Sequence, residues 1–166
     1  MIGYGRKKEN VKHQRGFTIL ELVTVLAIIF IVTAIAIPGF QKMAINGNLK
    51  AAARDVMSDI TRTREKAISE NNPNLSMVFN QPLNNYTVPA FYAGSLETKS
   101  PATFAQDISI SNVAFGMGSA LSLQTRGTIY PASPTNKTLT LINGRGSTAT
   151  ITITTVGRIY VQYNLQ

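Results

Sequence analysis

The sequence predicts an α+β fold: one long N-terminal helix whose second half packs on a C-terminal antiparallel β-sheet. Two observations support this prediction. Residues 17–71 have helical patterning, first as an uninterrupted apolar run and then as an apolar stripe on one face. Residues 74–166 are rich in β-branched and aromatic residues, in short alternating runs separated by Gly, Pro and Asn. The second half of the helix and the sheet together comprise roughly 115 residues, which is enough for one hydrophobic core.

The apolar run extends from Phe17 to Ile37 and contains a single charged residue, Glu21. Roughly 20 residues, at 1.5 Å per residue, cross the ~30 Å of hydrocarbon in a bilayer. A buried helix of a soluble protein is the alternative, but a chain of 166 residues has too little core to cover such a helix on every side. We therefore predict a membrane-spanning helix over residues 17–38.

A basic segment precedes this helix. Residues 1–16 contain five Lys or Arg and one Glu, which gives a net charge of +4. By the positive-inside rule this charge keeps the N-terminus cytoplasmic and places residues 39–166 across the membrane. The alternative, an ordinary secretory signal peptide, needs a small-residue cleavage site after the apolar run. Here Ala34-Ile35-Ala36 lies inside the run, and Pro38 follows closely.

Pro38 and Gly39 interrupt the helical pattern. Proline removes one helical hydrogen bond and glycine adds backbone freedom, but amphipathic patterning resumes at once, so we expect a kink rather than a plain helix end. The helix should continue to about Asn71, where Pro73 disfavours helix in the preceding residue. Its charges, Asp55 and Asp59 among them, have both signs and are interpreted as a solvated face without a site. The predicted core-facing residues are Ile45, Leu49, Ala52, Ala53, Val56, Ile60, Ala67 and Ile68.

Seven strands are predicted in the C-terminal region, and the segment from Tyr92 to Gln106 is predicted as a loop. Boundaries of such elements are less certain than their existence. The predicted strands are Leu75 to Phe79, Tyr86 to Phe91, Ile108 to Phe115, Leu121 to Thr125, Thr138 to Ile142, Thr148 to Thr154 and Arg158 to Tyr163.

The last two hairpins must keep their buried faces in phase, so each connecting loop needs an odd number of residues. A three-residue turn at 155–157, with Gly157 in the left-handed conformation, satisfies this requirement, and so does a five-residue loop at 143–147. The glycines of that loop are turn formers rather than a phosphate cradle, because no helix and no Lys-Ser/Thr pair follows. The predicted shared face consists of Leu139, Leu141, Ala149, Ile151, Ile153, Ile159 and Val161.

The join between leader and apolar helix carries the motif Gly-Phe-Thr-Ile-Leu-Glu at residues 16–21. It resembles the class III signal of type IV pilins and of type II secretion pseudopilins. The resemblance implies that a prepilin peptidase cuts between Gly16 and Phe17 on the cytoplasmic side and N-methylates Phe17. The helix is then retained, first as an anchor in a bacterial inner membrane and later as the core of a filament built with other pilins or pseudopilins. It implies a lollipop arrangement with a periplasmic head over residues 39–166.

Glu21 is the carboxylate of greatest interest, because a charge inside a membrane helix costs on the order of several kcal/mol unless it is paired. Cleavage after Gly16 would create a positively charged amine at Phe17, four residues away on the same helical face. Glu21 would then neutralise this amine, or that of a neighbouring subunit, and so select the register of assembly. The simpler alternative is a carboxylate solvated at the lipid interface.

The C-terminal region resembles the FimT/GspH family of minor pilins and pseudopilins, through Arg126-Gly127 after a strand and the terminal hairpin with Gly157-Arg158. In that family, GspH-type members lie near the tip of a type II secretion pseudopilus, and FimT-like members belong to type IV pili, some of which bind DNA for uptake. The DNA-binding members share a Gly-Arg-x-Arg motif, whereas this chain has Tyr160 in place of the second arginine. We favour a minor pseudopilin, with a DNA-binding minor type IV pilin as the alternative.

Charge gives little support to DNA binding. The chain has a net charge of +8, but +4 of it lies in the leader, so +4 remains after cleavage. Arg126, Arg145 and Arg158 are candidate phosphate contacts beside Tyr160 and Tyr163, whose rings could stack on single-stranded bases. We favour the interpretation that they are ordinary surface arginines and strand aromatics.

The sequence offers little for catalysis. It has no cysteine, and its single histidine, His13, lies in the leader. Outside the helix the only carboxylates of the remaining chain are Glu97 and Asp107, predicted on or beside loops, and no serine has a visible base partner. We therefore expect no enzymatic activity, no metal site, no cofactor and no small-molecule substrate.

Overall fold

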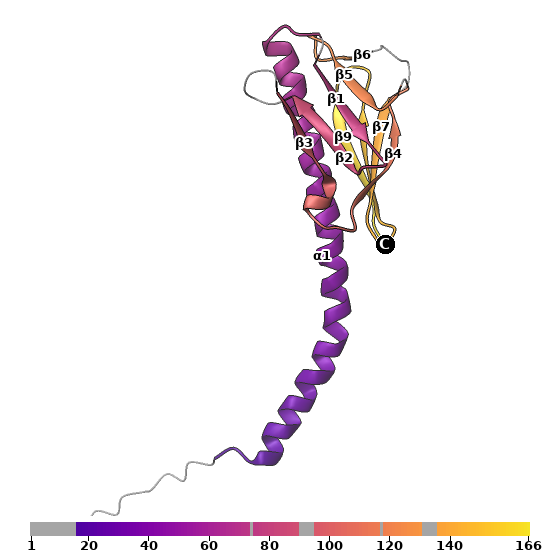
Figure 1. Cartoon of the computed structure of the whole chain (residues 1–166). Coiled ribbons are helices and arrows are strands. Elements are labelled where there is room, and N and C mark those ends of the chain that lie inside the picture. Colours follow the sequence, from indigo (N-terminus) through magenta and orange to yellow (C-terminus); the bar gives the residue numbers. More distant parts are fainter. Residues whose placement is uncertain (1–15, 74, 90–94, 117, 131–135) are drawn as a thin grey trace, which may run out of the picture. The chain divides into compact units, whose positions relative to one another are not determined.

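The structure is a computed structural model that describes residues 16–73, 75–89, 95–116, 118–130 and 136–166. The chain divides into two compact units, Met1–Phe40 and Gln41–Gln166. One helix, α1 (Ile19–Ser69), contributes to both units, and the second unit adds strands and a short 3-10 helix (Figure 1).

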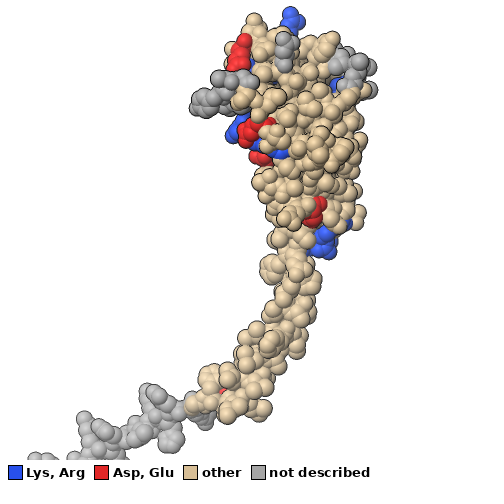
Figure 2. All heavy atoms as spheres, viewed as in Figure 1, with Lys and Arg blue, Asp and Glu red and all other residues tan. Residues whose placement is uncertain are grey.

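In the first unit, α1 forms a continuous apolar segment whose side chains are almost all exposed. Figure 2 shows the described part of this segment as a nearly uncharged surface. Two hydroxyls within it, Thr24 Oγ1 and Thr33 Oγ1, donate to the carbonyl oxygens four residues earlier, at 2.8 and 2.7 Å. They therefore need no partner outside the helix. By length and composition α1 is able to cross a membrane, the one such helix among the described residues.

Pro38 lies inside α1, so the helix does not end at the Pro38-Gly39 pair. The alternative of a plain helix end is therefore wrong, and the kink stays a prediction. The helix ends at Ser69, two residues before the predicted end. Asn71 adopts a left-handed conformation (φ 49°), and Asn72 N–H donates to the Ala67 carbonyl at 3.1 Å. This pattern is a Schellman motif with asparagine in place of glycine.

The C-terminal half of α1 buries one stripe in the core of the second unit. Most predicted core-facing residues are confirmed, but Ile45 is only half-buried and Ile68 is exposed. Polar residues on the same stripe are buried too, which the apolar pattern did not predict. The buried residues of the stripe are Asn46, Leu49, Ala52, Ala53, Val56, Asp59, Ile60, Thr63 and Ala67.

The strands form two antiparallel sheets, where the sequence predicted one. The five-stranded sheet has the order β3-β2-β1-β5-β6, and the four-stranded sheet has the order β4-β7-β8-β9. Both sheets and α1 contribute to one hydrophobic core, in which Phe79 stacks on Tyr86 and meets Phe115 edge-on. The strands are β1 (Leu75–Asn80), β2 (Asn85–Pro89), β3 (Leu96–Lys99), β4 (Ser109–Ala114), β5 (Ala120–Leu123), β6 (Ile129–Tyr130), β7 (Lys137–Ile142), β8 (Thr148–Ile153) and β9 (Ile159–Asn164).

The segment predicted as a loop, Tyr92 to Gln106, contains the edge strand β3 and a short 3-10 helix, η1 (Pro101–Thr103). The loop prediction is therefore wrong over these residues, and its positions 92–94 lie outside the described residues. β3 reads Leu-Glu-Thr-Lys and is mostly exposed, so it has no apolar alternation that could have revealed it. Glu97 consequently lies in a strand and not on a loop.

The hairpin phase is confirmed. Thr154 N–H donates to the Arg158 carbonyl at 2.9 Å, and Gly157 has φ 79°. The register pairs Ile153 with Ile159 and Ile142 with Thr148, so both loops have the predicted odd length. The predicted face of β7 and β8 is buried, and the two β9 residues are half-buried against the core.

Candidate functional site

The residues of the predicted processing site lie at the start of α1. Gly16 and Phe17 precede the helix, and the Phe17 side chain is exposed. Thr18 caps the helix: its Oγ1 accepts a hydrogen bond from Glu21 N–H at 3.2 Å, and its carbonyl accepts from Leu22 N–H. Thr-x-x-Glu is the capping-box pattern. The motif at residues 16–21 therefore also fixes where the helix begins, a role that sequence reasoning missed although the pattern was visible.

Glu21 occupies the first turn of α1, where a carboxylate is favourable beside the positive end of the helix dipole. Its side chain is exposed, and no hydrogen bond to its carboxylate is found within the described residues. Because the helix begins at Ile19, Phe17 is outside it in the uncleaved chain. The predicted pairing of Glu21 with a new amine at Phe17 therefore concerns the cleaved chain and stays a prediction.

Two of the three candidate arginines are brought together. Arg126 lies in the β5–β6 turn and Arg158 in the β8–β9 turn, and both are exposed. The two turns touch at Gly127 and Gly157, since a Cβ added to Gly157 would clash with the Gly127 carbonyl. Beneath them Arg64 Nε donates to the same carbonyl at 2.8 Å. The contact places Arg126 and Arg158 on adjoining turns, both of which Arg64 contacts; we call these three residues the basic patch.

Arg145 does not belong to this patch. It lies in the β7–β8 loop, at the opposite end of the six-residue strand β8 from Arg158, and so about 20 Å away. Tyr163 lies at that far end as well, and its ring is covered by Lys50 Nζ at 5.9 Å from the centroid. Tyr160 is exposed near the Arg158 end of β9. The predicted edge of three arginines beside two tyrosines is therefore wrong as a single surface.

Comparison with known proteins supports the N-terminal motif and the fold. The prokaryotic N-terminal methylation motif matches residues 11–37. Two crystal structures of the type IV minor pilin FimU from Pseudomonas aeruginosa have a similar fold. They give TM-scores of 0.52 and 0.53 at 18% identity, over 69% and 70% of this chain and 92% and 90% of theirs. The fold of the chain is therefore that of a type IV pilin-like protein. No curated protein matches it.

Asp59 is buried in the second unit, although it was predicted to be solvated. Lys99 Nζ lies 2.9 Å from each of its carboxylate oxygens, and Tyr86 Oη donates to Oδ2 at 2.8 Å. Asp59 comes from α1, Tyr86 from β2 and Lys99 from β3. We call this group the Asp59 cluster. It ties the edge of the five-stranded sheet to the helix.

Electrostatics in the Asp59 cluster favours a charged lysine and a neutral phenol. Burial alone would lower the pKa of Lys99, but hydrogen bonds to Asp59 and the nearby carboxylates outweigh it and raise that pKa above its usual value. Burial, together with the hydrogen bond to Asp59, raises the pKa of Tyr86 far above its usual value. The cluster therefore holds one buried anion with one cation. No group of three or more metal-ligating side chains is found in the described parts of the chain.

Proposed function

We propose that this chain is a structural subunit of a pilus-type filament. In this proposal a prepilin peptidase cuts after Gly16 and methylates Phe17, with the N-terminus cytoplasmic and the head periplasmic. The apolar helix first anchors the subunit in the inner membrane and then packs against the helices of other subunits. Glu21 neutralises a terminal amine during assembly. The observation that carries the proposal is the methylation motif joined to an exposed apolar helical segment with a single charge, Glu21.

Two kinds of filament remain as candidates. The C-terminal resemblance and the missing second arginine favour a minor pseudopilin of a type II secretion system. The fold similarity to a type IV minor pilin supports a minor pilin as the second candidate. Deleting the gene in its own host discriminates between them. Loss of exported enzymes from the medium supports the pseudopilin, and loss of twitching or of DNA uptake supports the pilin.

Replacing Gly16 by valine is expected to abolish processing, because a residue without Cβ lets the backbone approach the peptidase closely. The chain is expressed in a bacterium with a prepilin peptidase and its size is followed on a gel. The wild type should lose its 16 leader residues, whereas the variant keeps them. Gly39→Val is the matched control, since a Cβ at Gly39 meets no atom within 4 Å and lies away from the cut. Normal cleavage of Gly16→Val contradicts the proposed site.

DNA contact belongs to the second candidate, and the contact between the two arginine turns is the observation in its favour. Gel retardation with the full chain in detergent tests it. If the basic patch binds DNA, Arg158→Ala weakens binding by removing a phosphate contact. Arg145→Ala, at the other end of β8, should have little effect. Equal retardation by both variants and the wild type removes Arg158 from any DNA site.

A further inference from the structure

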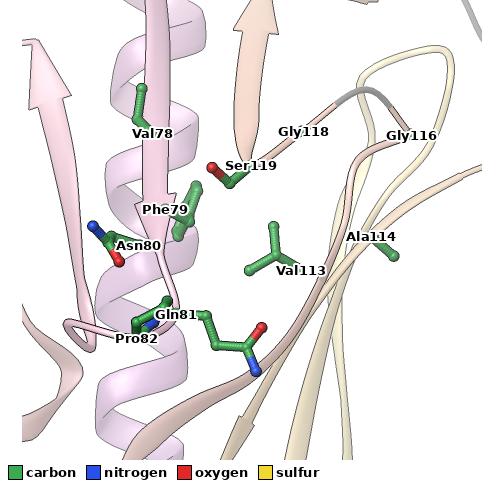
Figure 3. Close-up of a pocket in the computed structure, with 10 residues that line it drawn as sticks. All are labelled: Val78, Phe79, Asn80, Gln81, Pro82, Val113, Ala114, Gly116, Gly118 and Ser119. Carbon is green, nitrogen blue, oxygen red and sulfur yellow. The ribbon is translucent and has the colours of Figure 1, made fainter.

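Two regions of the described chain are candidates for contact with another molecule. One is a slot of about 740 Å³ between β1 and β4 (Figure 3), which is open to solvent and whose lining does not select one occupant. The other is the start of α1, which the N-terminal methylation motif covers, a motif typical of chains that an enzyme modifies. The start of α1 also has a defined hydrogen-bond geometry, and it therefore carries the stronger inference.

Thr18 decides where α1 begins. Its Oγ1 accepts a hydrogen bond from Glu21 N–H and its carbonyl accepts one from Leu22 N–H, both at 3.2 Å. Thr18 is therefore the N-cap, the last residue before the helix. Residues 11–23 contain no other Ser, Thr, Asp or Asn, the side chains that cap helices best.

Without Thr18, the nearest preceding residue that can serve as a cap is Gly16, since glycine also occupies N-caps. A helix capped by Gly16 would begin at Phe17. Its first hydrogen bond would then join the Gly16 carbonyl to the N–H four residues later, that of Leu20. In the observed structure the described main-chain hydrogen bonds include none to the Gly16 carbonyl. The cap at Thr18 therefore keeps this carbonyl out of the helix.

The Gly16 carbonyl is the group that the proposed cleavage attacks. Hydrolysis adds one water across the Gly16–Phe17 bond and leaves a carboxylate on Gly16 and an ammonium on Phe17. A carbonyl oxygen that accepts a helical hydrogen bond is shielded from the donors that an enzyme uses to polarise it. The fold itself does not require glycine here, since a Cβ at Gly16 meets no atom within 4 Å and its φ is not positive. This glycine therefore serves a contact outside the chain.

We propose that Thr18 is a positioning residue for this cleavage. Its hydroxyl holds the helix start at Ile19, and the Gly16 carbonyl stays free for the peptidase. This role rests on the proposed function, because Thr18 acts on the cut after Gly16. It gives Thr18 a conformational task and no contact with the peptidase.

The test measures the rate of leader removal from the full chain in membranes that contain a prepilin peptidase. Thr18→Val keeps the shape of the side chain but cannot accept from Glu21 N–H, and cleavage should slow about fivefold. Thr18→Ser and Thr18→Asn keep an accepting oxygen and should be cut within about twofold of the wild-type rate. Thr24→Val is the matched control, because the Thr24 hydroxyl bonds inside the helix, to the Leu20 carbonyl at 2.8 Å. Its rate should not change.

Amide exchange of the uncleaved full chain in micelles reports the helix start directly. Leu20 N–H should exchange more slowly in Thr18→Val than in the wild type, because it then bonds the Gly16 carbonyl. Wild-type cleavage of Thr18→Val, or unchanged exchange at Leu20, overturns the positioning role and leaves the cut after Gly16 standing. Slow cleavage of Thr18→Asn with normal cleavage of Thr18→Ser assigns the hydroxyl to a peptidase contact and also overturns that role. A wild-type chain that is not cut after Gly16 overturns both the role and the proposed function.

Discussion

Replacing Lys99 by methionine is expected to lower the free energy of unfolding of the second unit by about 3 kcal/mol. Asp59 is almost completely buried, and Lys99 is the cation in contact with it. Removing the lysine leaves a buried carboxylate whose remaining close partner in the cluster is the Tyr86 hydroxyl. The expected loss is at the lower end of the range for broken buried pairs because the Lys99 side chain is 26% exposed. Chemical denaturation of the full chain in micelles, followed by the circular dichroism of the sheets, measures it.

Two variants separate the buried charge from lost packing. In the double variant Asp59→Asn/Lys99→Met no charge is left unpaired and the asparagine carbonyl still accepts from Tyr86, so most of the stability should return. Glu70→Gln breaks the Lys66–Glu70 pair, which is 3.8 Å long and in which the Glu70 side chain is 50% exposed, and should cost less than about 1 kcal/mol. A double variant no more stable than Lys99→Met contradicts the account of the Asp59 cluster.

The pH dependence provides a second measurement of the same interaction. The pKa of Lys99 is raised in the folded chain from its usual 10.5, because its carboxylate partners outweigh its burial. The stability that the lysine contributes is therefore complete below pH 10.5 and is lost as pH rises through the folded pKa. Raising the pH above 10.5 should therefore lower the free energy of unfolding of the wild type more than that of Lys99→Met, so the two values should converge.

Replacing Gly157 by alanine is expected to lower the free energy of unfolding by about 3 kcal/mol or more. Gly157 has φ 79°, which costs an L-residue roughly 1–2 kcal/mol. A Cβ there would also clash with the Gly127 carbonyl, a backbone atom that already accepts from Arg64. Relief of the clash would separate the two arginine turns. The measurement is the same denaturation of the full chain.

Gly118→Ala is the matched control, because Gly118 also has φ 79° but a Cβ there meets no atom within 4 Å. It should show the backbone cost alone, roughly 1–2 kcal/mol. The difference between the two variants then measures the packing of the turns. Equal losses would mean that the turn contact contributes nothing to stability.

Much of the fold could be predicted from local patterns. The apolar run, the stripe on α1 and the phase of the last hairpins each repeat with a period that sequence displays directly. Gly157 was predictable in its conformation, because a three-residue hairpin turn requires a left-handed residue. The N-terminal motif combines several such local requirements within six residues, and Thr18 shows that helix capping is one of them.

What could not be predicted depends on contacts distant in sequence. Asp59 looks like any charge at the edge of a stripe until Lys99, 40 residues later, is placed beside it. β3 is a polar edge strand whose pairing partner, not its composition, makes it a strand. The division into two sheets and the separation of Arg145 from Arg158 follow from strand order, which short alternating runs do not encode.

The N-terminal mass of the chain recovered from bacterial membranes tests the central claim most directly. The proposal predicts a mature chain that begins at Phe17, carries one methyl group on its α-amino nitrogen and retains the whole apolar helix. A chain that still begins at Met1 would contradict processing. A chain that begins after the apolar run, beyond Ile37, would show that the helix is a discarded signal and not the packing core of a filament.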